Sequence, residues 1–178
     1  MRRKSCTAAF FDVDNTLLNL KSMFAFQAYF YANASSHTGT FANMAEFVAD
    51  LHSCNGSEDR SALNRRFYES FRGRRVDAVS QLAEQWFAAA LAQFGDSLWI
   101  ASARELAEQL RDEGFLLVAV SGSSHEILRP LLRHLEFDAC LATTLASEAG
   151  VYTGHIIPPQ LIGAGKAEAM RRFAQERG

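Results

Sequence analysis

The sequence is poor in features that mark exported, disulfide-bonded or membrane-spanning chains. It has 178 residues, with only three cysteines and three prolines. No cysteines form a CxxC pair, so neither a zinc site nor a disulfide framework is predicted, and a reduced cytoplasmic setting fits best. The apolar run Phe115–Val120 is too short to span a bilayer. Asp12 interrupts the apolar stretch after the basic residues 2–4, so no export signal is expected.

The charge composition gives no sign of a polyanionic partner. Lysine and arginine number 18 against 20 acidic residues, for a formal net charge of −2. A nucleic-acid or anionic-membrane surface is therefore not expected. The hydrophobic content of 48% is ordinary for a globular chain of this length, which can build one core or a core with a small lid.

Hydrophobic periodicity predicts an α/β fold with a helical insertion. Residues 7–13 form a short apolar run typical of a buried strand, and residues from about 19 to 95 read as helical. Strand and helix patterns alternate after residue 98, with strands expected at 115–120 and 138–142. Such alternation favours a Rossmann-like parallel sheet with crossover helices.

These patterns predict the domain organisation. We expect residues 1–18 and 96–178 to form the α/β core and residues 19–95 to form a helical cap.

Three local features are predicted within the second half of the chain. Residues 121–124 (SGSS) are expected to form a turn whose serines cap the following helix, which we expect to kink or restart near Pro130. Residues 150–154 are expected to form a hairpin turn, and a last helix should follow Lys166.

Two acidic residues follow the first predicted strand. Asp12 and Asp14 are two positions apart, so both can face the crevice beyond the carboxyl end of the sheet. Adjacent carboxylates repel unless a cation or unequal environments separate their roles, and oxygen ligands suit Mg²⁺. One aspartate could then attack phosphorus while the other protonates the leaving oxygen.

An Asx-rich turn and a calcium-binding loop are two simpler interpretations of this segment. An Asx-rich turn at the end of a strand explains the spacing alone about as well. A calcium-binding loop does not fit, because Leu17 stands where such a loop needs glycine and Met23 where it needs glutamate.

The segment DVDNTL after an apolar strand resembles the first motif, DxDx[TV], of the haloacid dehalogenase-like (HAD) superfamily. The resemblance implies that Asp12 is the nucleophile and Asp14 the general acid/base. It also implies that Asp12 and the Asp14 backbone carbonyl help to hold Mg²⁺, and that Thr16 contributes to phosphate binding. The dehalogenase branch lacks the second aspartate, so phosphoryl chemistry is favoured.

Two further motifs occur in the order that this superfamily has. Ser121 and Gly122 follow an apolar strand and offer a hydroxyl and an N–H to a phosphate, although helix capping alone also explains such serines. Lys166 follows Gly163-Ala164-Gly165 and could neutralise a phosphate, although a single lysine is usually a surface residue. The resemblance makes Ser121, Gly122 and Lys166 phosphate ligands.

The stretch EAGVYTGHIIPPQLIGAGK resembles the phosphoserine phosphatase-like branch, which has a helical cap after the first motif. The resemblance implies a Mg²⁺-dependent phosphomonoesterase that acts on a small phosphorylated metabolite through an aspartyl-phosphate. A phosphotransferase of the same family and a non-catalytic binding or scaffold protein remain alternatives.

The fourth motif of the superfamily, an acidic GDxxxD-like turn, has no counterpart after Lys166. We therefore expect a longer natural polypeptide or a fragment. This chain alone should bind Mg²⁺ weakly and have little or no activity, unless another residue such as Glu148 replaces the ligand. The strand that carries Asp12 should have an open edge, which could favour a homodimer.

Several arginines gather in the predicted cap. We expect most of this cluster to form a solvated helix face, with the alternative that one of them binds an anionic group of the substrate. Its members are Arg65, Arg66, Arg72, Arg74 and Arg75.

Overall fold

The computed structural model describes residues 7–34, 40–53 and 60–177. Cys6 and Cys54 lie outside these ranges, as do the basic residues 2–4. Cys140 lies on a strand, and burial raises the pKa of its thiol to about 12.

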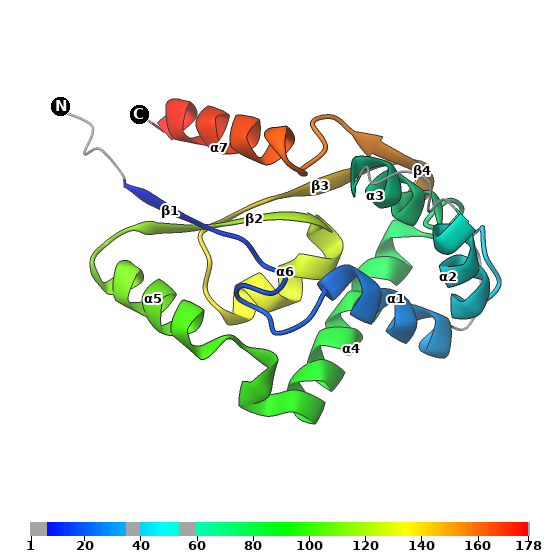
Figure 1. Cartoon of the computed structure of the whole chain (residues 1–178), viewed down its shortest axis with the longest axis horizontal. Helices are drawn as coiled ribbons and strands as arrows, with labels where there is room; N and C mark the ends of the chain where they lie inside the picture. Colours follow the sequence, from blue (N-terminus) through cyan, green and yellow to red (C-terminus); the bar gives the residue numbers. More distant parts are fainter. Residues whose placement is uncertain (1–6, 35–39, 54–59, 178) are drawn as a thin grey trace.

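A four-stranded sheet in the order β1-β2-β3-β4 forms the centre of the molecule (Figure 1). Its strands are β1 (Ala8–Phe11), β2 (Leu116–Ser124), β3 (Ala139–Glu148) and β4 (Val151–Ile157). The first three strands are parallel, and β4 pairs antiparallel with β3 as a hairpin. This arrangement confirms the predicted α/β class and places β1 at an edge of the described sheet.

Helices cover both faces of the sheet. Figure 1 shows α5 (Ala101–Asp112) and α6 (His125–His134) on one side and α7 (Ala164–Arg177) on the other. Because β1 and β2 are parallel, their carboxyl ends lie at the same edge of the sheet, where ligands bind in sheets of this kind.

The chain between β1 and α5 is mostly helical in its described parts. It contains α1 (Ser22–Asn33), α2 (Met44–Ser53), α3 (Arg60–Glu69), α4 (Val76–Phe94) and the 3₁₀ helix η1 (Gly95–Leu98). Figure 1 shows them beside one end of the sheet, with α4 reaching back to pack against α6. The division into core and cap remains a prediction, because one continuous hydrophobic cluster joins the two parts.

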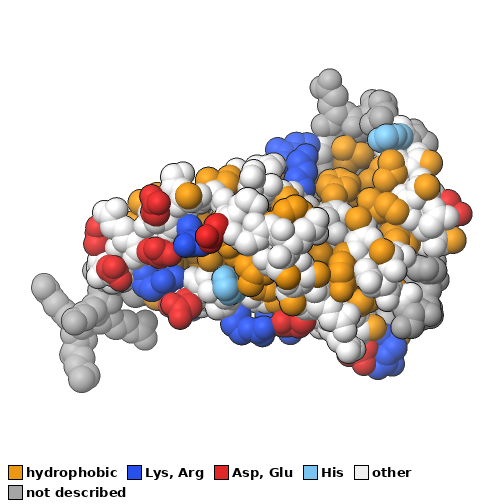
Figure 2. Space-filling view, turned by 90° about the horizontal axis from the view of Figure 1, so that it is seen from below, with side chains coloured by type: hydrophobic (Ala, Val, Ile, Leu, Met, Phe, Trp, Pro, Cys, Tyr) orange, Lys and Arg blue, Asp and Glu red, His pale blue; other side chains and the backbone are white. Residues whose placement is uncertain are grey.

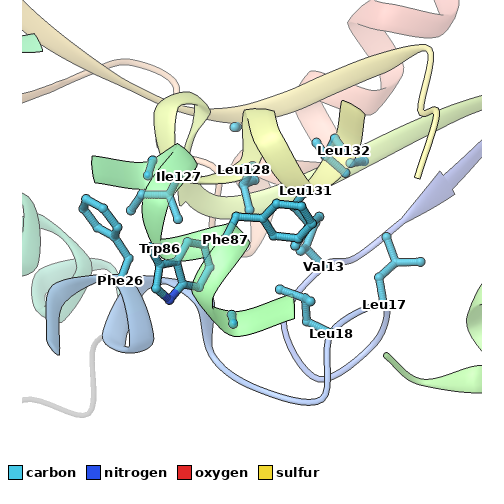
Figure 3. Packing of buried hydrophobic residues seen from close by; sticks show 14 of the residues in the cluster. Val13, Leu17, Leu18, Phe26, Trp86, Phe87, Ile127, Leu128, Leu131 and Leu132 are labelled. Atoms are coloured by element: carbon cyan, nitrogen blue, oxygen red, sulfur yellow. The ribbon is translucent and has the colours of Figure 1, made fainter. Parts of the chain in front are cut away.

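That cluster anchors the loop after β1. Val13, Leu17 and Leu18 are buried in it. Figure 3 shows these loop side chains beside Phe87 of α4 and the leucines of α6. Full burial of such a side chain contributes roughly 1.5–3 kcal/mol, so the cluster holds the loop that carries both aspartates.

The structure corrects the predicted turn at residues 121–124. Strand β2 continues through Ser124, and α6 begins only at His125. Ser124 occupies the N-cap position without a side-chain capping bond. The serines are therefore part of an irregular strand end rather than a capping turn.

The predicted hairpin turn is also corrected, and so is a restart of the helix at Pro130. The tip of the hairpin is Ala149-Gly150, both with positive φ, and residues 151–154 belong to β4. Pro130 lies inside α6, which is one continuous helical segment, so the helix does not restart there.

Arg74 does not belong to a solvated helix face. Its side chain is 1% exposed and its guanidinium lies 3.7 Å from the centre of the Phe30 ring. It donates hydrogen bonds to Gln27 and to the Tyr31 hydroxyl. Other arginines of the cluster are paired, as in the interaction of Arg66 with Asp50 and Glu69.

The surface is uneven in character. Figure 2 shows charged side chains toward the α5 end and more hydrophobic ones toward the opposite end, where α1 to α4 lie. Phe24 of α1 and Phe94 of α4 are both 42% exposed. In the described parts of the chain, no helix is both long and apolar enough to cross a membrane.

Candidate active site

Asp12 and Lys166 meet at the carboxyl end of β1. The Asp12 Oδ1 atom lies 2.8 Å from Lys166 Nζ and accepts a hydrogen bond of 2.8 Å from the Val13 N–H. The side chains are 50% and 26% exposed, so the pair is open to a ligand from solvent. This places the predicted nucleophile and the predicted phosphate-binding lysine in direct contact.

A tight loop after Asp12 fixes the second aspartate. The Val13 carbonyl accepts N–H groups from Thr16, Leu17 and Leu18 at 3.3, 2.9 and 2.9 Å. Asn15 adopts a φ of 57°, a left-handed conformation that asparagine tolerates better than most residues. Thr16 is half-buried in this loop, and its role as a phosphate ligand stays a prediction.

Asp14 occupies a more enclosed environment than Asp12. Its Oδ1 atom accepts the Ser22 N–H at 3.0 Å, at the start of α1. Burial raises the pKa of the Asp14 carboxyl, and the hydrogen bonds from Ser22 oppose that shift only in part. A carboxyl with a raised pKa holds a proton more readily, as a general acid requires.

Ser121 lies at the carboxyl end of β2 and is 1% exposed. Its Oγ accepts the Ser123 N–H at 3.0 Å, which leaves its own hydroxyl proton for another acceptor. The Ser123 Oγ in turn lies 3.1 Å from the Ser22 Oγ. These contacts connect the segment with Ser121 to the residue that holds Asp14.

Close packing of Gly165 sets the position of Lys166. A Cβ atom at Gly165 would lie 1.9 Å from the Gln160 carbonyl oxygen, so only glycine fits there. The Gly165 N–H also donates to the Ile162 carbonyl at 3.0 Å. The first turn of α7 can therefore lie close enough for Lys166 to reach Asp12.

The donors for a metal come from one loop. Asp12 and Asp14 offer an all-oxygen set that suits Mg²⁺, which one or two carboxylates with water and substrate phosphate commonly hold. Within the described ranges, no group of three acidic, histidine or cysteine side chains is placed to bind a metal. Glu148, at the end of β3, forms no such group with Asp12 and Asp14, so the structure does not support it as a substitute ligand.

Sequence reasoning missed several residues around the site. Ser22 is fully buried beside Asp14, and its place at the start of a helix after the aspartates was the available signal. Asn64 and Tyr68 of α3 both donate to the Gly122 carbonyl. No local pattern indicates those two, because 58 and 54 positions separate them from Gly122.

Comparison with known proteins identifies the family of the chain. The family model described as haloacid dehalogenase-like hydrolase matches residues 9–178. A putative hydrolase of Mycobacterium leprae (strain TN) is 30% identical over 175 residues, 96% of this chain and 56% of that protein. Phosphoserine phosphatase SerB1 of Mycobacterium tuberculosis (strain ATCC 25618 / H37Rv) is 30% identical over 176 residues, 96% of this chain and 55% of that protein. The chain thus spans about half the length of these curated relatives.

Solved structures share the fold. A protein of unknown function from Bordetella pertussis Tohama I gives a TM-score of 0.80 at 18% identity, covering 98% of this chain and 77% of that one. A substrate-bound phosphoserine phosphatase complex gives 0.63 at 16% identity, covering 97% and 72%. The chain therefore belongs to the haloacid dehalogenase-like hydrolase family and resembles its phosphoserine phosphatase-like branch.

Proposed function

We propose that this chain carries the catalytic aspartates of a Mg²⁺-dependent phosphomonoesterase that acts on a small phosphorylated metabolite. The contact between Asp12 and Lys166 carries the proposal. A lysine there can neutralise the charge of a bound phosphate beside the carboxylate that would attack it.

The two aspartates have separate tasks in the proposed reaction. A carboxylate oxygen of Asp12 attacks phosphorus, and the bond from phosphorus to the ester oxygen breaks as Asp14 gives that oxygen a proton. Asp14 then takes a proton from water, which attacks the aspartyl-phosphate and releases phosphate and the Asp12 carboxylate. The unequal burial of the two side chains supports this division, because it raises the pKa of Asp14.

Four other groups would bind and neutralise the phosphate. The Ser121 hydroxyl and the Gly122 N–H would hold its oxygens, together with Thr16 and the Lys166 ammonium. Mg²⁺, held by Asp12 and the Asp14 carbonyl, would add positive charge against the phosphate when bound. The names of the relatives make phosphoserine one member of the substrate panel.

A phosphate-release assay tests the proposal. The chain should release phosphate slowly from at least one metabolite in a panel of phosphomonoesters in the presence of Mg²⁺, because its Mg²⁺ binding is expected to be weak. Asp12→Asn should abolish release while the thermal melt stays close to wild type, because the amide is nearly isosteric but cannot be the nucleophile.

Asp96→Asn is the matched control, because the Asp96 side chain is 99% exposed on η1. It should leave release unchanged. Wild-type turnover in Asp12→Asn would remove Asp12 from the reaction.

A further inference from the structure

The phosphate loop, residues 121–124, leaves two residues outside the pairing of the sheet. Ser121 pairs with Ala142 and Ser124 pairs with Thr143, so consecutive residues of β3 face residues three apart on β2. Gly122 and Ser123 lie in the resulting bulge and have no pairing partner on β3. Bulged residues need other partners for their backbone groups when they are buried.

Side chains supply those partners at the Gly122 carbonyl. It accepts hydrogen bonds from Thr143 Oγ1 at 2.8 Å, Tyr68 OH at 3.0 Å and Asn64 Nδ2 at 3.2 Å. A carbonyl oxygen has two lone pairs, so the two shorter bonds should dominate. One of these comes from the sheet and the other from α3.

Asn64 also connects α3 to the segment before Lys166. Its Oδ1 accepts a hydrogen bond of 2.8 Å from Gln160 Nε2, which also donates to the Ser61 carbonyl. Gln160 precedes Lys166, and its neighbour Ile162 would lie 3.3 Å from a Cβ on Gly122. Helix α3 is therefore bonded to both segments that carry predicted phosphate ligands.

The Gly122 carbonyl determines the direction of an N–H group across the same peptide unit. The peptide is planar and trans, so an oxygen held toward α3 points the Ser123 N–H the opposite way. That N–H donates to Ser121 Oγ at 3.0 Å. Fixing the carbonyl thus orients the Ser121 oxygen and leaves its proton for a ligand.

We propose that Tyr68, assisted by Asn64, is a positioning residue through which α3 orients the Gly122–Ser123 peptide and the Ser121 hydroxyl. The phosphate site is then complete only while α3 is docked on the phosphate loop. The phosphate ligand in this inference rests on the proposed function. The contact between α3 and residues 121–124 rests only on the hydrogen bonds from Asn64 and Tyr68 to the Gly122 carbonyl.

Tyr68→Phe removes the hydroxyl and keeps the ring against Phe67 and Phe71. Two readouts on the whole chain test the inference: hydrogen exchange at the Ser123 amide and NMR titration with inorganic phosphate. Loss of one neutral hydrogen bond should raise the exchange rate of the Ser123 amide roughly two- to tenfold and weaken phosphate binding by a similar factor. Thr143→Val should act in the same direction from the side of the sheet.

Tyr152→Phe is the matched control. Tyr152 is also buried and also packs on Phe71, and its hydroxyl lies near the Glu126 carboxyl rather than among the donors to the Gly122 carbonyl. This variant should leave Ser123 exchange and phosphate affinity unchanged, so any general loosening of the fold is measured separately.

The outcomes separate the two proposals. Unchanged Ser123 exchange in Tyr68→Phe, or an equal rise in Tyr152→Phe, would overturn the positioning role. If wild-type chain binds no phosphate while exchange still rises in Tyr68→Phe alone, the proposed function fails and the coupling of α3 to the loop is supported.

Discussion

Asp14 illustrates how a single loop can give two carboxylates different chemistry. Asp12 is half-exposed and contacts Lys166, whereas Asp14 is more enclosed and lies under the start of α1. Burial raises the pKa of Asp14 above its value in an unfolded chain. The ionised form is therefore disfavoured by folding, and the stability present at low pH is lost as the pH rises through the raised pKa.

Asp14→Asn should consequently stabilise the fold at neutral pH while it impairs phosphate release. The amide cannot ionise, and its oxygen can still accept the Ser22 N–H. Each 1 kcal/mol gained would raise Tm by roughly 2–4 °C in a chain of this size. Thermal melts at neutral pH and near pH 4 check this prediction, and the gain should shrink at the lower pH. A lower Tm at neutral pH would contradict it.

At the level of single residues, short sequence motifs identified the residues of the candidate site that lie within them. Asp12 and Lys166 were chosen from patterns that lie 154 positions apart, and the structure brings them into contact. Their chemical roles remain predictions. Tyr68 could not be predicted, because its importance comes from a fold that places α3 against the end of β2.

The first turn of α7 depends on a close backbone contact. Gly165 lies against the Gln160 carbonyl, and Lys166 follows it immediately. A side chain at Gly165 would push the start of the helix away from the loop before it. The reach of Lys166 to Asp12 therefore depends on the absence of a side chain one residue earlier.

Gly165→Ala should destabilise the chain by about 1–3 kcal/mol and weaken phosphate binding, since an added methyl group overpacks this contact. Urea denaturation and phosphate titration measure the two effects. Ala164→Ser, at an exposed position in the same turn, should stay within about 0.5 kcal/mol of wild type. Wild-type stability of Gly165→Ala would show that the turn can shift without loss.

The helical block around α1 encloses an unusual cation. Arg74 is buried among aromatic rings, and its Nε has no hydrogen-bond partner within the described part of the chain. Burial lowers the pKa of its guanidinium to about 10. The free-energy cost of desolvating a buried charge can exceed the stabilisation that its neutral hydrogen-bond partners provide.

Arg74→Met should leave the free energy of unfolding within about 1 kcal/mol of wild type or increase it, because an apolar side chain of similar length avoids that desolvation. Chemical denaturation provides the measurement. Arg66→Met is the control, because it removes a guanidinium that has two carboxylate partners. A loss above about 3 kcal/mol in Arg74→Met would show that the cation–π contacts outweigh desolvation.

Elements with strong periodicity were predictable, and their ends were not. The alternation after residue 98 correctly indicated β2, α6 and β3. The SGSS segment predicts a capping turn, because serine favours helix N-termini. In the structure Tyr68 and Thr143 satisfy the carbonyl there, so distant contacts decide that the segment remains a strand.

At the scale of the whole molecule, the order of segments in the sequence predicts an α/β fold. A strand with two acidic residues, a long helical stretch and alternating elements predicted a parallel sheet with an insertion, and the sheet is observed. The packing of α4 on α6 could not be predicted, because helices in one insertion can dock in many ways. That packing joins the helical block and the sheet into one hydrophobic cluster.

The central claim is that Asp12 receives the phosphoryl group, and intermediate formation tests it most directly. The chain would be incubated with acetyl phosphate and Mg²⁺, quenched in acid and mapped by peptide mass spectrometry. We expect one phosphoryl group on Asp12, removed by hydroxylamine and absent in Asp12→Asn. A phosphoryl group on another residue, or equal labelling of Asp12→Asn, would contradict the claim.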